Sequence, residues 1–386
     1  MQAALARRLQ HALTERDTTH GRREVYSRQG APQRATLNGK PLINFSSNDY
    51  LGLAGDPRLI EAAQTAVEQF GVGAGASAAV SGYTIAHEEL EQTLAAFTRC
   101  ESALLFSTGY MANLAVVSAL ATRGQDVFED RLNHASLLDA VAMSRARLHR
   151  YPHADLQALA KMLADKQCDN ALVITDGVFS MDGDVAPIRE LVEICKHTGA
   201  ALIVDDAHGL GVIGSTGRGS FEYCTVDVSA ADALVGTFGK AFGVAGAFVA
   251  GDKLLIESLR QFARPHIYTT AMPPAQAATI SASLAIVSRD SALRSKLHEN
   301  IAYFEQRAAA LGLSITPTIT PIKPMLVGDN GEVLRIAETL RQRGYWVGAI
   351  RPPTVPAGTT RLRITLSAAH THEHIDGLLS ELRALI

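Results

Sequence analysis

The middle of the chain alternates short apolar or β-branched runs with longer segments in which apolar residues recur at helical spacing. The short runs predict strands at 103–106, 126–129, 147–151, 171–175, 201–205, 233–237 and 247–250. The longer segments predict helices at 111–120, 137–143, 155–163 and 188–197. This alternation predicts an α/β domain with a largely parallel sheet that helices cover on both faces.

The regions flanking this block follow a different pattern. An N-terminal helix, an extended segment at 42–46 and a helix at 57–70 are predicted before it. After Pro273 and Pro274, the pattern predicts helices at 275–288 and 292–311 and strands near 325–327, 345–347 and 361–365. We therefore expect an N-terminal helix and extended segment at 1–50, a large domain at 51–275 and a smaller α/β domain at 276–386. A crevice between two such domains is a common place for a ligand.

Composition and charge are those of an ordinary globular enzyme. The 386 residues include 36 Lys+Arg and 39 Asp+Glu, a net charge of −3, which argues against a nucleic-acid binder. The spacing of the four cysteines fits neither a metal knuckle nor a disulfide framework and indicates a reducing compartment: Cys100, Cys168, Cys195 and Cys224. Charges interrupt the N-terminal helix, unlike a secretory signal, and the charge-free stretch 241–251 is too short to cross a membrane. We expect a cytoplasmic protein without membrane contact.

Polar residues follow five of the predicted strands. In open α/β sheets, ligands bind beyond the carboxyl ends of the strands, so these residues are the candidates for chemistry. They lie at 107–110, 133–136, 176–182, 205–208 and 237–240.

Lys240 and Asp205 lie at the ends of two successive predicted strands. A lysine in this place is ordinarily a solvated surface residue, but small neighbours at Gly239 and Ala241 also suit a Schiff-base lysine that attacks an aldehyde. A buried carboxylate needs a cation, and a protonated pyridine nitrogen is one; the alternative is that Asp205 caps a turn. Because Lys240 follows Asp205 by one strand, we favour a pyridoxal phosphate site.

Two further strand ends have both a functional and a structural interpretation. Gly109, in STGYMAN (107–113), precedes a predicted helix whose amides could bind phosphate, or the segment is an ordinary N-cap. His134, in DRLNHASL (130–137), could stack on a planar ring, or it could be a structural histidine.

Together these segments resemble the α-oxoamine synthase family of pyridoxal phosphate enzymes over nearly the whole chain. The resemblance rests on NFSSNDYLGL (44–53), STGYMAN, DRLNHASL, TDGVFSMDGD (175–184), VDDAHGLGVIG (204–214), TFGKAFG (237–243), MPPAQA (272–277) and IRPPTVPAGTTRLRITLSAAH (350–370). It implies an aminotransferase-like fold of type I, with a mostly parallel seven-stranded sheet in the large domain. It also implies a homodimer with shared active sites.

The resemblance implies a role for each matching residue. Lys240 would bind the cofactor as a Schiff base, Asp205 would pair with the pyridinium nitrogen, and His134 would stack on the ring and contact substrate. Further cofactor contacts would come from Gly109, Tyr110, Ser180, His208, Thr237 and, from the neighbouring subunit, Thr270. Substrate contacts would come from Asn48, Arg351, Thr354, Arg22, and from Arg363 as the partner of the amino-acid carboxylate. Ala78 and Ala79 depart from the family pattern, which leaves the acyl contacts of that loop open.

The implied reaction is the decarboxylative condensation of L-alanine with pimeloyl-CoA or pimeloyl-acyl-carrier-protein, a step of biotin biosynthesis. Alternatives are glycine with acetyl-CoA, another amino acid and acyl thioester, a catalytically silent pyridoxal phosphate protein, or an NAD-dependent oxidoreductase. The last would use GxGxxG at 209–214, but no apolar helix pattern follows those glycines. HxHxH at 370–374 lacks acidic or cysteine partners, so we expect no metal site, and the glycines at 71, 73 and 75 follow a helix and predict a turn.

Overall fold

The computed structural model describes residues 1–166 and 170–386, which form two compact units. The larger unit contains residues 49–180 and 184–295, and the smaller contains 1–48, 181–183 and 296–386. This division does not test the domain boundaries expected at residues 50 and 275, which remain predictions. No helix in the described parts of the chain is long and apolar enough to span a membrane. Cys100, Cys195 and Cys224 are free thiols, and Cys168 lies outside the described residues.

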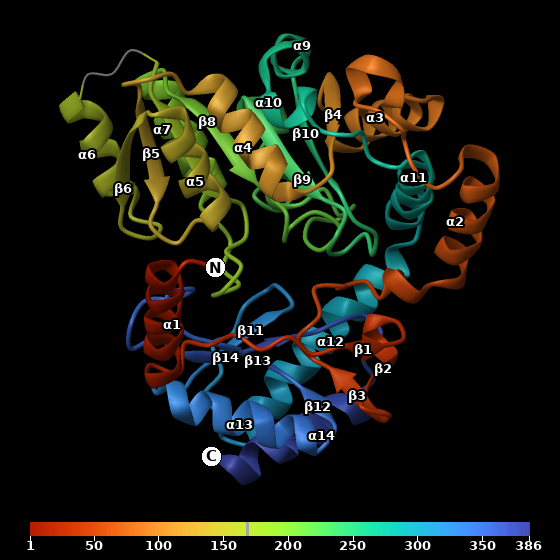
Figure 1. Cartoon of the computed structure of the whole chain (residues 1–386), viewed down its shortest axis with the longest axis vertical. Coiled ribbons are helices and arrows are strands. Elements are labelled where there is room, and N and C mark those ends of the chain that lie inside the picture. The colour runs from red at the N-terminus through yellow and green to blue at the C-terminus, as the bar shows by residue number, and fades with distance from the viewer. Residues whose placement is uncertain (167–169) are drawn as a thin grey trace. The chain divides into compact units, whose positions relative to one another are not determined.

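A seven-stranded sheet forms the centre of the larger unit (Figure 1). Its strands, in spatial order, are β4 (Ser102–Phe106), β10 (Ala247–Gly251), β9 (Ala233–Thr237), β8 (Ala201–Asp205), β7 (Leu172–Asp176), β5 (Asp126–Asp130) and β6 (Arg147–Tyr151). Only β10 runs antiparallel to its neighbours in this sheet. The predicted seven strands and the mostly parallel arrangement are confirmed.

Both faces of this sheet are buried, because successive side chains of each strand enter different cores. Ile174 and Ile203 pack in one core with helices α4 and α5, whereas Val173 and Val204 pack in a second core with α6 and α7. The helices of this unit are α2 (Pro57–Phe70), α3 (Ile85–Thr98), α4 (Gly109–Leu120), α5 (Ala135–Ser144), α6 (Leu156–Lys166), α7 (Ile188–Thr198), α8 (Ser220–Tyr223), α9 (Lys253–Phe262), α10 (Arg264–Ile267) and α11 (Pro274–Arg289). All four helices expected between the central strands are present.

The smaller unit contains two small sheets and three longer helices besides the N-terminal one. One sheet has the order β1 (Arg28–Gln29), β2 (Ala35–Leu37), β3 (Lys40–Asn44) and β12 (Tyr345–Trp346), and the other β11 (Ile322–Leu326), β14 (Arg361–Thr365) and β13 (Gly348–Ile350). The helices are α1 (Ala3–Thr18), α12 (Ser291–Ala310, from residue 296 onward), α13 (Asn330–Gln342) and α14 (His372–Leu385).

One strand of this unit differs from its expected position. β11 begins at Ile322 and pairs with β14 from Ile322 to Leu326, whereas the sequence pattern placed a strand at 325–327. The first residues of β11 include Lys323 and Pro324, which interrupt the apolar run in the sequence. Lys323 is nevertheless fully buried, because its ammonium is paired with Glu305 and donates to the Thr318 carbonyl.

The glycines at 209–214 make room for a buried carboxylate. Asp206 is completely buried and accepts a hydrogen bond of 2.6 Å from the Ser220 amide. A Cβ atom at Gly209 or Gly219 would overlap this carboxylate. Burial raises the pKa of Asp206 to about 7, although the bond from Ser220 opposes the shift. The GxGxxG pattern is therefore explained by packing around Asp206 and by positive φ at Gly211 and Gly214.

We expect Gly219→Ala to lower the free energy of unfolding by about 3 kcal/mol, because the new Cβ overlaps Asp206 at a residue with φ of +83°. Gly312→Ala is the matched control: its φ is +67°, but no atom lies within 4 Å of the added Cβ. The control should lose only about 1 kcal/mol. Denaturant unfolding of both variants measures the difference, and equal losses would contradict the packing argument.

Candidate functional site

Buried carboxylates gather at the carboxyl ends of β7 and β8. Asp176 and Asp205 are paired in register, Asp206 follows directly, and all three side chains are buried. Burial raises the pKa of Asp176 well above its usual value; Asp205 adds to the shift and Lys240 opposes it. Three buried carboxyl groups share this site with one lysine, so a ligand that carries a positive charge would favour their ionised forms.

Lys240 lies in the connection between β9 and the antiparallel strand β10. The connection is tightly folded: the Thr237 hydroxyl donates to the Gly246 carbonyl at 2.9 Å, and the Gly239 amide donates to Thr237 at 3.2 Å. The Lys240 carbonyl accepts a further bond of 2.9 Å from the Gly243 amide. The lysine side chain is half-buried.

A chain of hydrogen bonds joins Asp205 to His134. Asn113, in α4, contacts Asp205 Oδ2 at 2.6 Å and Ser136 Oγ at 2.8 Å. Ser136 Oγ lies 2.7 Å from His134 Nδ1. Although the imidazole keeps an exposed side, desolvation lowers the pKa of His134; Asp205 opposes this shift and Lys240 adds to it. The structure thus brings together Lys240, Asp205 and His134.

The other residues expected to hold the cofactor lie around this group or in the loops beside it. Gly109 begins α4, and a Cβ added there would lie 3.9 Å from that of Thr237. The Tyr110 hydroxyl donates to Asp139 of α5. His208 Nδ1 lies 2.7 Å from the hydroxyl of Tyr50, which is fully buried. Thr270 is exposed and forms an isolated antiparallel bridge with Ser77. This bridge does not involve Lys240, Asp205 or His134.

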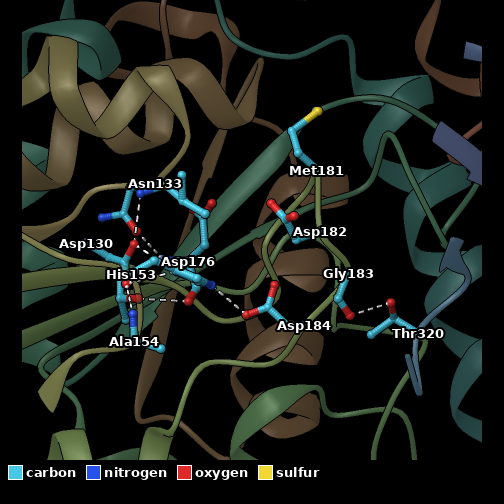
Figure 2. A network of polar contacts seen from close by, with 12 residues as sticks. Asp130, Asn133, His153, Ala154, Asp176, Met181, Asp182, Gly183, Asp184 and Thr320 are labelled. Carbon is cyan, nitrogen blue, oxygen red and sulfur yellow. Dashed lines mark hydrogen bonds and ion pairs between the residues drawn. The ribbon is translucent and has the colours of Figure 1, made fainter. Parts of the chain in front are cut away.

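Ser180 lies in a hairpin that a histidine ties to the sheet. Val178 and Val185 form a bridge in this hairpin, and Ser180 is buried. Figure 2 shows His153 between two carboxylates: its Nδ1 donates to Asp130 at 3.0 Å and its Nε2 to Asp184 at 2.9 Å. Burial alone would lower the pKa of His153, but the bonds to the two carboxylates outweigh it and raise the pKa to about 10.

The same view shows how the loop before His134 is held. The Asp176 amide donates to Asn133 Oδ1 at 3.0 Å (Figure 2). The His134 amide donates to Asp176 Oδ2 at 3.1 Å. Asn133 also donates to the carbonyl of Ile174 at 2.9 Å. The end of β7 therefore fixes the backbone that carries His134.

We expect His153→Gln to destabilise the protein most below pH 6.5. The folded pKa near 10 exceeds the unfolded value, so the charged form stabilises the fold fully below pH 6.5, and the effect is lost as pH rises toward 10. The loss at pH 6 should be about 3 kcal/mol, as for removal of one partner from a buried ion pair. Unfolding midpoints of wild type and variant between pH 6 and pH 10 test this, and a difference that does not shrink would contradict it.

In the smaller unit, two residues expected to bind substrate lie together. Arg363, on β14, is buried and donates to Asn48 Oδ1 at 3.1 Å. Arg361, two residues earlier on the same strand, forms an ion pair with Asp182. Figure 2 includes the neighbouring contact, in which the Thr320 hydroxyl donates to the Gly183 carbonyl at 2.7 Å.

The remaining expected substrate residues line a cavity of about 1020 Å³ in the smaller unit. Arg351 donates to the Arg22 carbonyl at 2.9 Å, and Arg23 donates to the Thr354 hydroxyl at 3.3 Å. Burial lowers the pKa of Arg351, and the charge of Arg23 adds to the effect. The Arg22 guanidinium itself is paired with Asp17 at 2.9 Å. Two arginines held this close to each other suit an anionic group.

The histidines at 370–374 each make other contacts. His370 is buried, stacks on Phe45 and accepts a 3.0 Å bond from the Ser367 amide; burial lowers its pKa to about 3. His372 stacks on Tyr303, and His374 Nδ1 accepts from the Thr371 amide. Within residues 1–166 and 170–386, no group of three metal-binding side chains is found.

Sequence reasoning assigned no individual role to four side chains next to this site: Tyr50, Asn113, Ser136 and Asp176. Ser136 and Asp176 lie within the candidate ranges 133–136 and 176–182, and Tyr50 belongs to NFSSNDYLGL. Asn113 lies inside the predicted helix 111–120, where a polar residue in an apolar segment was the available signal.

Comparisons of the sequence give one consistent result. Residues 40–382 match the family model described as aminotransferase class I and II. The 8-amino-7-oxononanoate synthase of Methylococcus capsulatus is 53% identical over 370 residues, which is 96% of this chain and 95% of the relative. That of Stutzerimonas stutzeri is 51% identical, over 98% of this chain and 94% of the relative.

Comparisons of the structure agree with those of the sequence. Serine palmitoyltransferase from S. paucimobilis, solved with a bound PLP–myriocin aldimine, superposes with a TM-score of 0.93. It is 32% identical, over 99% of this chain and 98% of that one. An 8-amino-7-oxononanoate synthase from Francisella tularensis has a TM-score of 0.78 and 30% identity, over 89% of this chain and 97% of that one.

Proposed function

We propose a reaction for this chain from the premise that it belongs to the aminotransferase class I and II family and, within it, to the α-oxoamine synthases. The resemblance drawn from the sequence motifs is thereby confirmed, as is pyridoxal phosphate as the cofactor. The chain acts as an 8-amino-7-oxononanoate synthase: it condenses L-alanine with a pimeloyl thioester and releases CO2. The acyl carrier is CoA or acyl carrier protein, and the enzyme is a cytoplasmic homodimer.

The observation that supports this proposal is the group formed by Lys240, Asp205 and His134. Asp205 would pair with the ring nitrogen of the cofactor, where a carboxylate favours the protonated nitrogen. His134 would stack on the ring. The α4 amides from Gly109 onward, Ser180 and Thr237 would hold the phosphate end, together with Thr270 of the partner subunit. Tyr110 and His208 complete the cofactor contacts. When bound, the cofactor supplies an electron sink for the carbanion at the amino-acid Cα.

Lys240 has two tasks in this proposal. Its amine would hold the cofactor covalently before substrate binds, and as a free amine Lys240 accepts the Cα proton of alanine. The tight connection from Thr237 to Gly246 fixes the lysine backbone. The charge of Lys240 opposes the rise in the pKa of Asp176 and Asp206, so these carboxyls, when ionised, would favour the positive charge that the amine gains with the proton.

Two groups of residues in the smaller unit bind the substrates. Arg363, oriented by Asn48, binds the carboxylate of alanine through its planar guanidinium. Arg22, Arg351 and Thr354 line the cavity of about 1020 Å³, which binds the acyl substrate. The free carboxylate of a pimeloyl chain suits the positive charge of the Arg23 and Arg351 pair, whereas an acetyl group lacks any such charge.

The second candidate keeps the chemistry and changes the substrates. An α-oxoamine synthase that joins glycine to acetyl-CoA would need no anion site for the acyl chain, and the arginines of the cavity argue against it. A comparison of kcat/KM for alanine with pimeloyl-CoA and for glycine with acetyl-CoA separates the two reactions.

Lys240→Ala should lower kcat by at least about 1000-fold, because both the covalent anchor and the base are lost. The visible absorption band of the lysine-bound cofactor should also disappear in this variant. Lys253→Ala is the matched control, because Lys253 is an exposed lysine at the start of α9. Absorption spectra and steady-state rates measure both effects, and substantial activity in Lys240→Ala would sink the assignment.

Arg363→Lys should raise the KM for alanine by about tenfold or more, because lysine cannot form two parallel bonds to a carboxylate. The KM for the acyl thioester should change little. Arg335→Lys is the control, because Arg335 is exposed and pairs only with Glu332 on the surface of α13. Initial rates at varied alanine measure the effect, and an unchanged KM for alanine would remove Arg363 from the substrate site.

A further inference from the structure

The bonds from Asp205 to His134 connect four side chains from three elements. Asn113 belongs to α4, Ser136 and the capping residue His134 to α5, and Asp205 to β8. Asn113 is 1% exposed, Ser136 0% and Asp205 7%, so solvent cannot replace these partners readily. Such buried polar chains favour one arrangement of donors and acceptors.

The direction of each bond follows from the hydrogens available. The Asn113 amide nitrogen has two hydrogens, and its two contacts are Asp205 Oδ2 at 2.6 Å and Ser136 Oγ at 2.8 Å. An ionised carboxylate only accepts, which places the nitrogen and not the oxygen of Asn113 toward Asp205. Ser136 Oγ therefore accepts from Asn113, and its own hydrogen remains for another partner.

That partner is His134. Ser136 Oγ lies 2.7 Å from His134 Nδ1, so the serine hydroxyl donates and Nδ1 accepts. The Ser136 amide also donates to Nδ1, at 3.3 Å. A ring nitrogen that accepts from two donors carries no proton, and the proton of the neutral imidazole is then on Nε2.

We propose that Asn113 and Ser136 are positioning residues that hold His134 as the Nε2–H tautomer and tie its ring to the ionised carboxylate of Asp205. The importance of this arrangement for catalysis rests on the proposed function, in which Asp205 would contact the nitrogen of the cofactor ring and His134 would stack on one face of the same ring. A single amide, that of Asn113, then fixes both contacts. The ring of His134 keeps one N–H donor, at Nε2, and cannot flip without losing both bonds to Nδ1.

The tautomer is measured directly by long-range proton–nitrogen NMR of the full chain labelled with 15N-histidine, without added cofactor. His134→Gln identifies the signals of His134. Wild type should show His134 protonated on Nε2 alone. Ser136→Ala should show a mixture of both tautomers, and Asn113→Asp, which cannot donate toward Asp205, should show the same. Ser144→Ala is the matched control, because this hydroxyl of α5 donates to the Val141 carbonyl at 2.8 Å and accepts from the Ala146 amide at 3.2 Å, and neither partner belongs to the chain from Asp205 to His134.

Kinetics of the holoenzyme give the second readout. Ser136→Ala should lower kcat by about tenfold, the effect of one lost hydrogen bond of ordinary strength, with little change in the KM for alanine. Ser144→Ala should keep both values. A wild-type His134 protonated on Nδ1, or a single Nε2–H tautomer retained in Ser136→Ala and Asn113→Asp, would overturn the proposal.

The two readouts separate this inference from the proposed function. The NMR measurement contains no cofactor and no substrate, so its result stands even if Lys240→Ala shows that the cofactor is held elsewhere. Conversely, failure of the tautomer assignment in a chain with the expected cofactor band and activity would remove only the roles of Asn113 and Ser136.

Discussion

The concentration of buried carboxyl groups at the ends of β7 and β8 is the constraint on which the rest of the site depends. Asp176 and Asp205 are in register, and Asp206 follows Asp205 along the chain. Each requires its own hydrogen-bond donor: Asp176 accepts from the His134 amide, Asp205 from Asn113, and Asp206 from the Ser220 amide, with glycines packed against it. The loops around the site are shaped by these partners, and a cationic ring bound there would favour the ionised carboxyls.

The same charges organise the electrostatics of catalysis. The charge of Lys240 acts on Asp176, Asp206 and His134, and its own proton exchange is part of the proposed reaction. His153 compensates a separate pair, Asp130 and Asp184, at the base of the hairpin that contains Ser180. Functional and structural carboxylates are therefore adjacent, and the two groups have different partners.

Sequence patterns predicted the central sheet well because its strands are buried on both faces and read as continuous apolar runs, such as ALIVD before Asp206. The same reasoning misplaced β11, because the sequence alone does not show that Lys323 is buried and paired with Glu305, and an isolated lysine suggests a surface residue. It found Lys240, Asp205 and His134, which follow strands. It placed Ser136 only within a candidate range. It gave Asn113 no role, because its partners Asp205 and Ser136 are distant in sequence and one polar residue within a helix has no periodic pattern.

The reversed direction of β10 determines how Lys240 can move. Because β9 and β10 are antiparallel neighbours, the segment that contains the lysine connects the end of β9 to the adjacent start of β10, with Thr237 opposite Ala247. Both ends of this segment are thus anchored to adjacent strands, unlike a loop that leads into a helix. In the proposed reaction, the movement of the amine from the cofactor to the Cα proton would therefore come from the four-carbon side chain, through rotations of its own bonds.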